Sequence, residues 1–238
     1  MIKPALAIAA LALAAPAALA QPLSCQPPAV VATPPAAIPD GPVRLLPITN
    51  YVLSLTWAPD FCDAHPGDPD AAFECQDKVA RFGFVLHGLW PDAAHGTWPQ
   101  WCPAKPPVTT QVPASVVRQM LCTTPSPGLI AHEWAKHGTC MAATPQIYFG
   151  QSAAMFHALR FPDMAGLARR PRLTAGDLRR AFVEANPRFP RESIGLLMRE
   201  GVALQEVHLC LDRTLHPAAC PAQTPPDSAE IRIAPPAR

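Results

Sequence analysis

The sequence predicts a single α+β domain that is stabilised by disulfides. Segments with the two-residue alternation of β-strands are interspersed with segments that suit amphipathic helices, and no internal repeat divides the chain. Removing a leader of 20 residues from 238 leaves 218, enough for one domain with a substantial core. All eight cysteines lie beyond that leader, and their even number favours four disulfides.

Residues 1–20 are typical of a signal peptide. Lys3 provides the positive start, an Ala/Leu/Ile run follows, and Ala18 and Ala20 form a small-x-small cleavage site. The alternative is a membrane anchor, for which this run is short and weakly apolar. We therefore expect a secreted or periplasmic protein that does not associate with a membrane.

The charge balance limits the class of partner. Without the leader the chain keeps 18 basic and 18 acidic residues, because the leader contains Lys3 and no acidic residue. A neutral chain is a poor candidate for coating nucleic acid, which needs many cations on one surface. Eight arginines do gather in residues 160–191, either as a solvated helix face or as a patch that steers RNA.

Proline marks the two margins of the domain. Residues 21–47 are rich in Pro, Ala and Val, which favours an extended arm or linker, held through Cys25. Residues 221–238 are again rich in proline, and we expect a loosely ordered tail. The catalytic domain is expected between them, over residues 48–220.

Four segments are predicted strands and four are predicted helices. The strands are residues 51–57, 82–86, 194–198 and 202–211. The helices are residues 113–121, 131–140, 146–159 and 174–185. Thr174 and Asp177 suit a capping box at the start of the last helix. Residues 60–77 are expected to form a disulfide-closed loop, and Gly88 with Pro91 to end the second strand directly after His87.

Residues 132–137 hold the densest cluster of reactive groups. On an α-helix, His132, Glu133, Lys136 and His137 would lie within an arc of about 140°. Two imidazoles, a carboxylate and an ammonium suit a reaction that needs a base, an acid and stabilisation of an anionic transition state. Phosphodiester transfer in RNA is such a reaction, because the 2'-hydroxyl is an internal nucleophile.

Two other enzyme classes fit the sequence less well. A zinc site of the metalloprotease type needs histidines four residues apart, whereas His132 and His137 are five apart. The charge of Lys136 would also oppose a dication. A serine hydrolase is disfavoured because the chain has no Gly-x-Ser-x-Gly segment.

Two segments resemble the active-site segments of the ribonuclease T2 family. They are FVLHGLWP at residues 84–91 and HEWAKHGTC at residues 132–140, and the likeness extends over roughly residues 50–220. The resemblance implies an α+β fold with a central antiparallel sheet, and no metal or cofactor. It also implies that single-stranded RNA is cleaved through a 2',3'-cyclic phosphate to 3'-phosphate ends.

The resemblance also implies roles for the site residues. His137 would be the base and His87 the acid of the transfer step, with the roles exchanged in hydrolysis. Glu133 and Lys136 would stabilise the phosphorane, and His132 would hold phosphate. The alternatives are an inactive relative, or an exported module that binds RNA or nucleotides without turnover.

Aromatic residues beside His87 suggest a base pocket with broad tolerance. Trp90 and Trp98 could stack on bases with little sequence preference, and Asp92 could accept from an exocyclic amine. The alternative is that these three are ordinary packing residues. Surface or structural roles are expected for the remaining histidines, which are His65, His95, His157, His208 and His216.

Proximity and the family likeness together suggest three disulfides and leave a fourth by exclusion. The suggested pairs are Cys62 with Cys75, Cys102 with Cys140, and Cys210 with Cys220, which leaves Cys25 with Cys122. The Cys102 pair would tie the end of the catalytic helix to the loop that follows His87. We expect a monomer whose partner is its RNA substrate.

Overall fold

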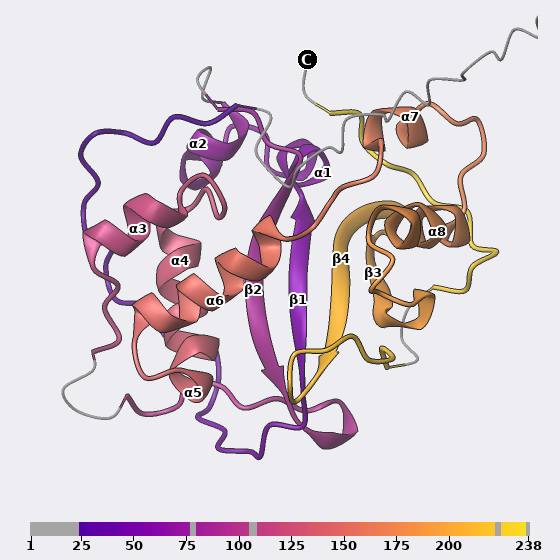
Figure 1. Cartoon of the computed structure of the whole chain (residues 1–238). Helices are drawn as coiled ribbons and strands as arrows, with labels where there is room; N and C mark the ends of the chain where they lie inside the picture. The colour runs from indigo at the N-terminus through magenta and orange to yellow at the C-terminus, as the bar shows by residue number, and fades with distance from the viewer. Residues whose placement is uncertain (1–23, 77–79, 105–108, 222–224, 237–238) are drawn as a thin grey trace, which may run out of the picture.

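Four strands form one antiparallel sheet in the order β2-β1-β4-β3 (Figure 1). The computed structural model describes residues 24–76, 80–104, 109–221 and 225–236, so the expected signal peptide lies outside the described residues. The strands are β1 (Asn50–Trp57), β2 (Phe84–Asp92), β3 (Ile194–Arg199) and β4 (Ala203–Asp212). The predicted α+β class with an antiparallel sheet is confirmed.

β2 is longer than the sequence predicts. It continues past His87 to Asp92, and Pro91 pairs with Tyr51 of β1. The expectation that Gly88 and Pro91 end the strand is therefore wrong. Proline is tolerated at this position because β2 is an edge strand, where a missing N–H can face away from the ladder.

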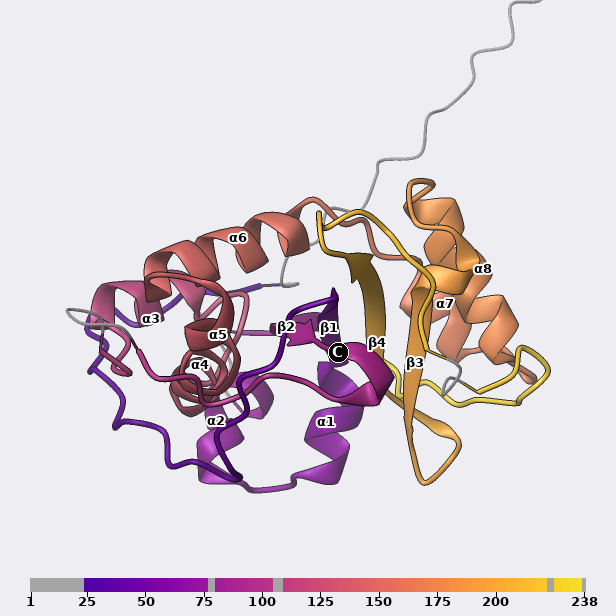
Figure 2. The same cartoon turned by 90° about the horizontal axis from the view of Figure 1, so that it is seen from below.

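Helices gather at both edges of the sheet. The α-helices are α1 (Ala58–Ala64), α2 (Ala72–Cys75), α3 (Ala114–Met120), α4 (Pro127–Glu133), α5 (Thr139–Met141), α6 (Pro145–His157), α7 (Met164–Ala168) and α8 (Ala175–Ala185). Short 3-10 turns are η1 (Pro69–Ala71), η2 (Ala94–Gly96) and η4 (Arg191–Ser193), and η3 (Trp134–Gly138) is π-helical. Figures 1 and 2 show α3 to α6 beside β2, and α7 and α8 beside β3.

A local signal predicts the start of α8, whereas the short helices of residues 60–77 were not predicted. Thr174 and Asp177 form the expected capping box of α8. The expectation of a loop over residues 60–77 is wrong, because α1, η1 and α2 occupy much of it. The Cys62–Cys75 disulfide links α1 to α2.

The strands alternate between a helix-covered face and an open face. Leu53 and Leu55 of β1 are fully buried on the covered face, together with Trp134, Tyr148 and Phe156 from the helical side. Val52 lies on the other face, where a cavity opens. The sheet therefore has a packed side and a side available for chemistry.

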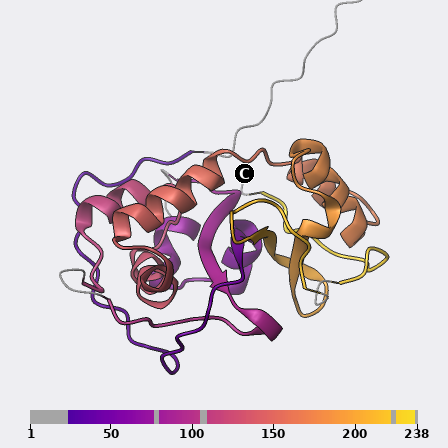
Figure 3. The same cartoon turned by 60° about the horizontal axis from the view of Figure 1, so that its bottom comes forward.

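Both proline-rich margins pack against the domain. The arm begins at Ser24, which pairs with Arg81, and runs around the outside of α3 before it reaches β1 (Figure 3). In the tail, Ile231 and Ile233 are buried, and the Ala234 carbonyl accepts a hydrogen bond from the indole of Trp57 at 2.9 Å. The expectation of a loosely ordered tail is therefore wrong for residues 225–236, while the domain boundaries remain predictions.

All four suggested disulfides are present. They are Cys25–Cys122, Cys62–Cys75, Cys102–Cys140 and Cys210–Cys220. The first holds the N-terminal arm, and the third joins Cys140 in α5, at the end of the second sequence motif, to the loop after β2. The segments around the two sequence motifs are thus covalently connected.

Candidate active site

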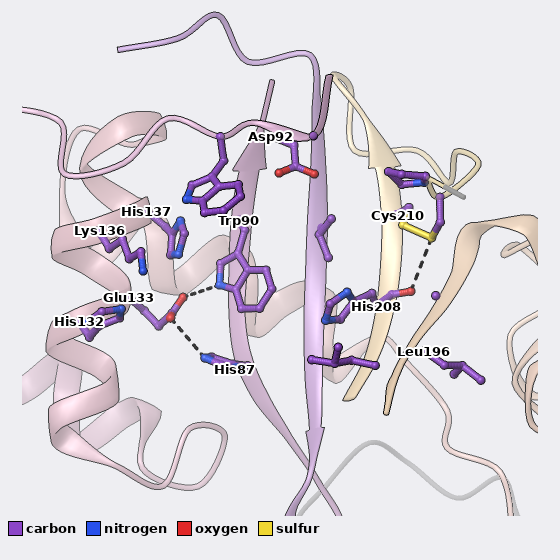
Figure 4. A pocket seen from close by; sticks show the side chains of 17 residues that line it. His87, Trp90, Asp92, His132, Glu133, Lys136, His137, Leu196, His208 and Cys210 are labelled. Carbon is purple, nitrogen blue, oxygen red and sulfur yellow. Dashed lines mark hydrogen bonds and ion pairs between the residues drawn. A yellow bond between two sulfur atoms is a disulfide. The ribbon is translucent and has the colours of Figure 1, made fainter. Parts of the chain in front are cut away.

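A cavity of about 500 Å³ opens on the uncovered face of the sheet (Figure 4). All eight non-cysteine site residues that the sequence predicts line it: His87, Trp90, Asp92, Trp98, His132, Glu133, Lys136 and His137. Its floor crosses β1 and β4 at Val52 and His208 and reaches Leu196 on β3. No residue of the arginine-rich segment 160–191 lines this cavity.

A β-bulge turns His87 towards the cavity. Ser54 of β1 pairs with Gly88, and Leu55 pairs with Leu86, so His87 has no partner on β1. In a regular ladder His87 would oppose Leu55 and face the helices. The extra residue of a bulge re-aims a side chain in this way. A side chain at Gly88 would overlap the carboxylate of Glu133, so this position needs glycine.

The helix that carries the second motif is not α-helical throughout. α4 ends at Glu133, and η3 continues it as a π-helical turn, whose hydrogen bonds join residues five apart. The expectation of one continuous α-helix over residues 131–140 is therefore wrong, and both His132 and His137 line the cavity. Lys136 lies between them and lines the same cavity. Among the residues that the structure describes, no group of three or more His, Cys, Asp or Glu side chains is arranged to hold a metal ion.

Two carboxylates flank the imidazole of His87. Its Nδ1 lies 2.7 Å from Oε1 of Glu206, and its Nε2 lies 3.6 Å from Oε1 of Glu133. Burial alone would lower the pKa of His87, but the hydrogen bond to Glu206 and the charges of Glu133, Glu206 and Glu74 together raise it above its ordinary value. These contacts therefore favour the protonated form of His87.

Glu133 is buried at the centre of the site. Its Oε2 accepts a hydrogen bond from the indole Nε1 of Trp90 at 2.8 Å, and the Tyr148 hydroxyl lies 3.5 Å from the same oxygen. Burial raises the pKa of Glu133 to about 7, although the charge of His87 opposes this shift. Its charge therefore depends strongly on pH near neutrality.

The surroundings of His137 shift its pKa in the opposite direction to that of His87. It is buried, and its Nδ1 has no hydrogen-bond partner among the described residues. Burial and then the positive charges of Lys136, His132 and His87 lower its pKa to about 3. His137 is therefore neutral at ordinary pH, with a ring nitrogen able to accept a proton.

A carboxylate from the N-terminal arm occupies the cationic corner of the site. Oδ2 of Asp40 lies 2.7 Å from Nζ of Lys136 and 3.9 Å from Nε2 of His132, and Oδ1 accepts from the Trp101 indole at 3.0 Å. The hydrogen bond from Lys136 is the main reason that the pKa of Asp40 is lowered. Burial and then the charge of Lys136 lower the pKa of His132.

The three residues predicted to contact the base lie along the side of the cavity nearest β2. The ring of Trp90 is 5.6 Å from that of His137, measured between centroids. Trp98 is partly exposed, and the guanidinium of Arg44 lies 4.4 Å from its ring centroid. Asp92 accepts a hydrogen bond from Asn50, and burial raises its pKa. The cavity lining therefore contains two indole rings, and Asp92 adds a second carboxyl group to that of Glu133.

Three site residues lie outside both motifs and were missed. They are Glu206 and His208 of β4 and Asp40 of the arm. Of these, only His208 was considered, and a surface or structural role was expected for it. The alternation in β4 carried a signal for the first two. Glu206, His208 and Cys210 share one face of the strand and alternate with the apolar residues Val207, Leu209 and Leu211.

The comparisons with known proteins point to one family. A family model, the ribonuclease T2 family, matches residues 48–169. A probable ribonuclease of Haemophilus influenzae is 33% identical over 127 residues, which are 49% of this chain and 45% of that protein. A ribonuclease of Aeromonas hydrophila is 27% identical over 168 residues, which are 68% of this chain and 71% of that protein.

Solved structures share the fold. An RNase-related protein from Calystegia sepium superposes with a TM-score of 0.62 at 21% identity, covering 79% of this chain and 98% of that chain. RNase NT in complex with 5'-AMP superposes with a TM-score of 0.60 at 21% identity, covering 80% of this chain and 99% of that chain. Because the family model matches more than half of the sequence and spans both active-site segments, this chain belongs to the ribonuclease T2 family.

Proposed function

We propose that this protein is a metal-independent endoribonuclease that cleaves single-stranded RNA by attack of the 2'-hydroxyl on the adjacent phosphate. The observation that carries the proposal is the pair of imidazoles with opposite pKa shifts that line one cavity, His87 raised and His137 lowered. General acid–base catalysis needs one protonated and one neutral group at the same time. The products would be a 2',3'-cyclic phosphate and then a 3'-phosphate.

The two histidines act together in the transfer step. His137 accepts the proton of the 2'-hydroxyl while O2' attacks phosphorus, and His87 donates a proton to the departing O5'. A phosphate bound beside His137 raises its pKa towards neutrality, because a nearby anion favours the charged imidazolium. In hydrolysis of the cyclic phosphate the roles are exchanged: His87 takes a proton from water and His137 returns one to O2'.

Lys136 and Glu133 stabilise the pentacoordinate phosphorus between the histidines. Lys136 offers a compact positive charge to a non-bridging oxygen, and His132 holds phosphate beside it. Glu133, with its pKa raised to about 7, donates a hydrogen bond when protonated and supports His87 when ionised. Both states of this carboxyl group are accessible at neutral pH.

Broad base tolerance follows from the lining of the cavity. Trp90 and Trp98 supply aromatic faces, on which any base can stack at about 1–3 kcal/mol per base. Asp92 lines the same cavity, and its carboxyl group would favour bases with an exocyclic amine. We infer a bias in cleavage rather than restriction to one base.

The disulfides support action outside the cytoplasm. Four disulfides persist in an oxidising compartment, which fits a secreted or periplasmic enzyme. No helix of the described residues is long and apolar enough to cross a membrane. We propose that the enzyme acts there as a monomer on RNA.

Incubation of the mature protein with RNA in excess EDTA tests the proposal. We expect fragments that end in 2',3'-cyclic phosphate, followed by 3'-phosphates, at a rate that EDTA does not change. The His137→Ala variant is the control for a contaminating nuclease. Binding of RNA without these products would indicate a binding module instead, and loss of cleavage in EDTA would indicate a metal-dependent reaction.

A further inference from the structure

Glu206 lies outside both active-site segments, yet it touches the histidine assigned as the acid. It is 3% exposed, and its carboxylate makes three contacts. Oε1 lies 2.7 Å from Nδ1 of His87, and Oε2 lies 2.7 Å from Nε2 of His208. Oε2 also accepts a hydrogen bond from the Ser54 hydroxyl at 3.0 Å. A buried carboxylate with this many partners is held in one position.

We propose that Glu206 is a positioning residue that orients His87 and fixes its tautomer, and that His208 anchors Glu206 from the opposite side. An ionised carboxylate can only accept hydrogen bonds, so Nδ1 of His87 must carry the hydrogen. Nε2, which points towards Glu133 and the cavity, is then the one nitrogen of His87 that exchanges protons (Figure 4). This inference rests on the proposed function, because it assigns a role within the same reaction.

Three carboxyl groups influence His87, and their charges respond differently to pH. Burial raises the pKa of Glu74 on α2 to about 8 and that of Glu133 on α4 to about 7, so both lose charge near neutrality. The hydrogen bonds and charges of His208 and His87 outweigh burial and hold the pKa of Glu206 well below its usual range. On the other side of the cavity Lys136 adds positive charge, whereas burial lowers the pKa of both His132 and His137 and favours their neutral forms. Glu206 is therefore the carboxylate that stays ionised across the working range.

The sheet brings Glu206 and its partners together from three neighbouring strands, β2, β1 and β4. The bulge at His87 in β2 turns its ring to the cavity face, and a second irregularity, between Leu197 and Met198, interrupts the pairing of β3 with β4 next to Glu206. The ring of His208 also contacts Trp90 edge-on, with 5.5 Å between centroids. His208 thereby connects the positioning group to the wall of the proposed base pocket.

The Glu206→Gln variant removes the charge and keeps the shape. We expect kcat on RNA to fall about 10- to 100-fold with KM within about two-fold, as when a partner that orients a catalytic histidine is lost. Because His87 must be protonated to act as the acid, the alkaline limb of the pH profile of kcat/KM should move to lower pH. Glu184→Gln makes the same charge change on an exposed site of α8 and should alter neither quantity.

An NMR titration separates this inference from the proposed function, because it needs no RNA. The ¹⁵N signals of His87 are assigned by their loss in the His87→Gln variant. In the wild-type protein at a pH where His87 is neutral, their chemical shifts should report the Nδ1–H tautomer. In Glu206→Gln, the midpoint of the His87 titration should move to lower pH. The Nε2–H tautomer in the wild-type protein, or an unchanged midpoint and pH profile in Glu206→Gln, would overturn the inference. If Glu206→Gln does not fold, the wild-type tautomer still decides. If the protein shows the expected tautomer of His87 but does not cleave RNA, the proposed function is rejected, while the inference that Glu206 positions His87 stands.

Discussion

His87 and His137 face the same cavity, but different neighbours surround them. His87 contacts two carboxylates, whereas His137 is buried beside Lys136 and His132 and has an unpartnered Nδ1 among the described residues. The opposite pKa shifts come from these neighbours and not from the histidines themselves. The proposed division into acid and base therefore depends on the environment of each residue.

Replacing either histidine should reveal this division. We expect His87→Ala and His137→Ala each to lower kcat by about 10²- to 10⁴-fold, because each removes a group that transfers a proton. Initial rates on a dinucleotide substrate measure this loss. His65→Ala is a matched control, since His65 is exposed and does not line the cavity. A wild-type kcat in either variant would reject the two-histidine mechanism.

Glu74 should make the stability of the fold depend on pH. Its Oε1 is buried without a hydrogen-bond partner among the described residues, and burial raises its pKa from 4.5 to about 8. Below pH 4.5 the group is protonated in both the folded and the unfolded chain. Between pH 4.5 and about 8 only the unfolded chain releases the proton, so the free energy of unfolding falls as pH rises.

The Glu74→Gln variant should remove this loss. We expect a gain of at least about 1 kcal/mol at pH 7, seen as a melting temperature about 2–4 °C higher, and almost no gain at pH 4. Thermal melts of both proteins at the two pH values measure the difference. Glu184→Gln, at an exposed site, should change neither melt. An equal gain at both pH values would show that Glu74 is not the source.

Among the elements, the N-terminal arm bears most directly on the site. Asp40 neutralises Lys136, the group that we assign to the transition state, and it also approaches His132. The arm is held on one side by the Cys25–Cys122 disulfide and on the other by the pairing of Arg44 with Gln100. It therefore presents an internal carboxylate where the phosphate of the substrate would bind.

The Asp40→Asn variant should bind phosphate more tightly. Removing the carboxylate frees the charge of Lys136, so KM for RNA and the Kd for inorganic phosphate should both fall by several-fold, which corresponds to about 1 kcal/mol. Calorimetry with phosphate and steady-state kinetics measure the two constants. Asp70→Asn makes the same change in net charge at an exposed site that does not line the cavity. Higher constants in Asp40→Asn would mean that Asp40 helps to bind the substrate.

The tail should contribute to stability in spite of its proline content. Ile233 is 3% exposed, and Ile233→Ala should lower the free energy of unfolding by about 2–4 kcal/mol, because it leaves a cavity in the core. Ile38→Ala is the matched control in the other margin, since Ile38 is 86% exposed and its loss should cost under about 0.5 kcal/mol. Urea unfolding at equilibrium measures both. Equal effects would show that the tail does not pack as described.

At the scale of the whole molecule, the disulfides should stabilise according to the length of chain that they close. Cys25–Cys122 closes a separation of 97 residues, and Cys62–Cys75 closes 13. Loop-closure entropy predicts losses of about 4–5 and about 3 kcal/mol when each pair is replaced by serine. Unfolding of the two double variants measures the difference. A larger loss for the short loop would mean that local packing outweighs chain entropy here.

The sequence was sufficient where the signal is local. The capping residues of α8, the alternation in β1 and the two motif segments each depend on neighbours within a few positions, and all appear in the structure. The cysteine pairs followed from proximity and from the likeness to a family. The eight non-cysteine site residues came from the motifs and from aromatic residues close to His87, and the structure places them around one cavity.

Only the tertiary structure decided the features that depend on contacts between distant segments. The π-helical turn at η3 and the bulge at His87 were not predicted, and the bulge changes which way His87 points. Glu206 lies 119 residues from His87, and Asp40 lies 96 residues from Lys136, so no local pattern joins these pairs. The sequence by itself determined the eight non-cysteine residues that line the cavity from the two motif regions. The fold determined their protonation, because burial and neighbouring charges arise only when the strands and the arm come together.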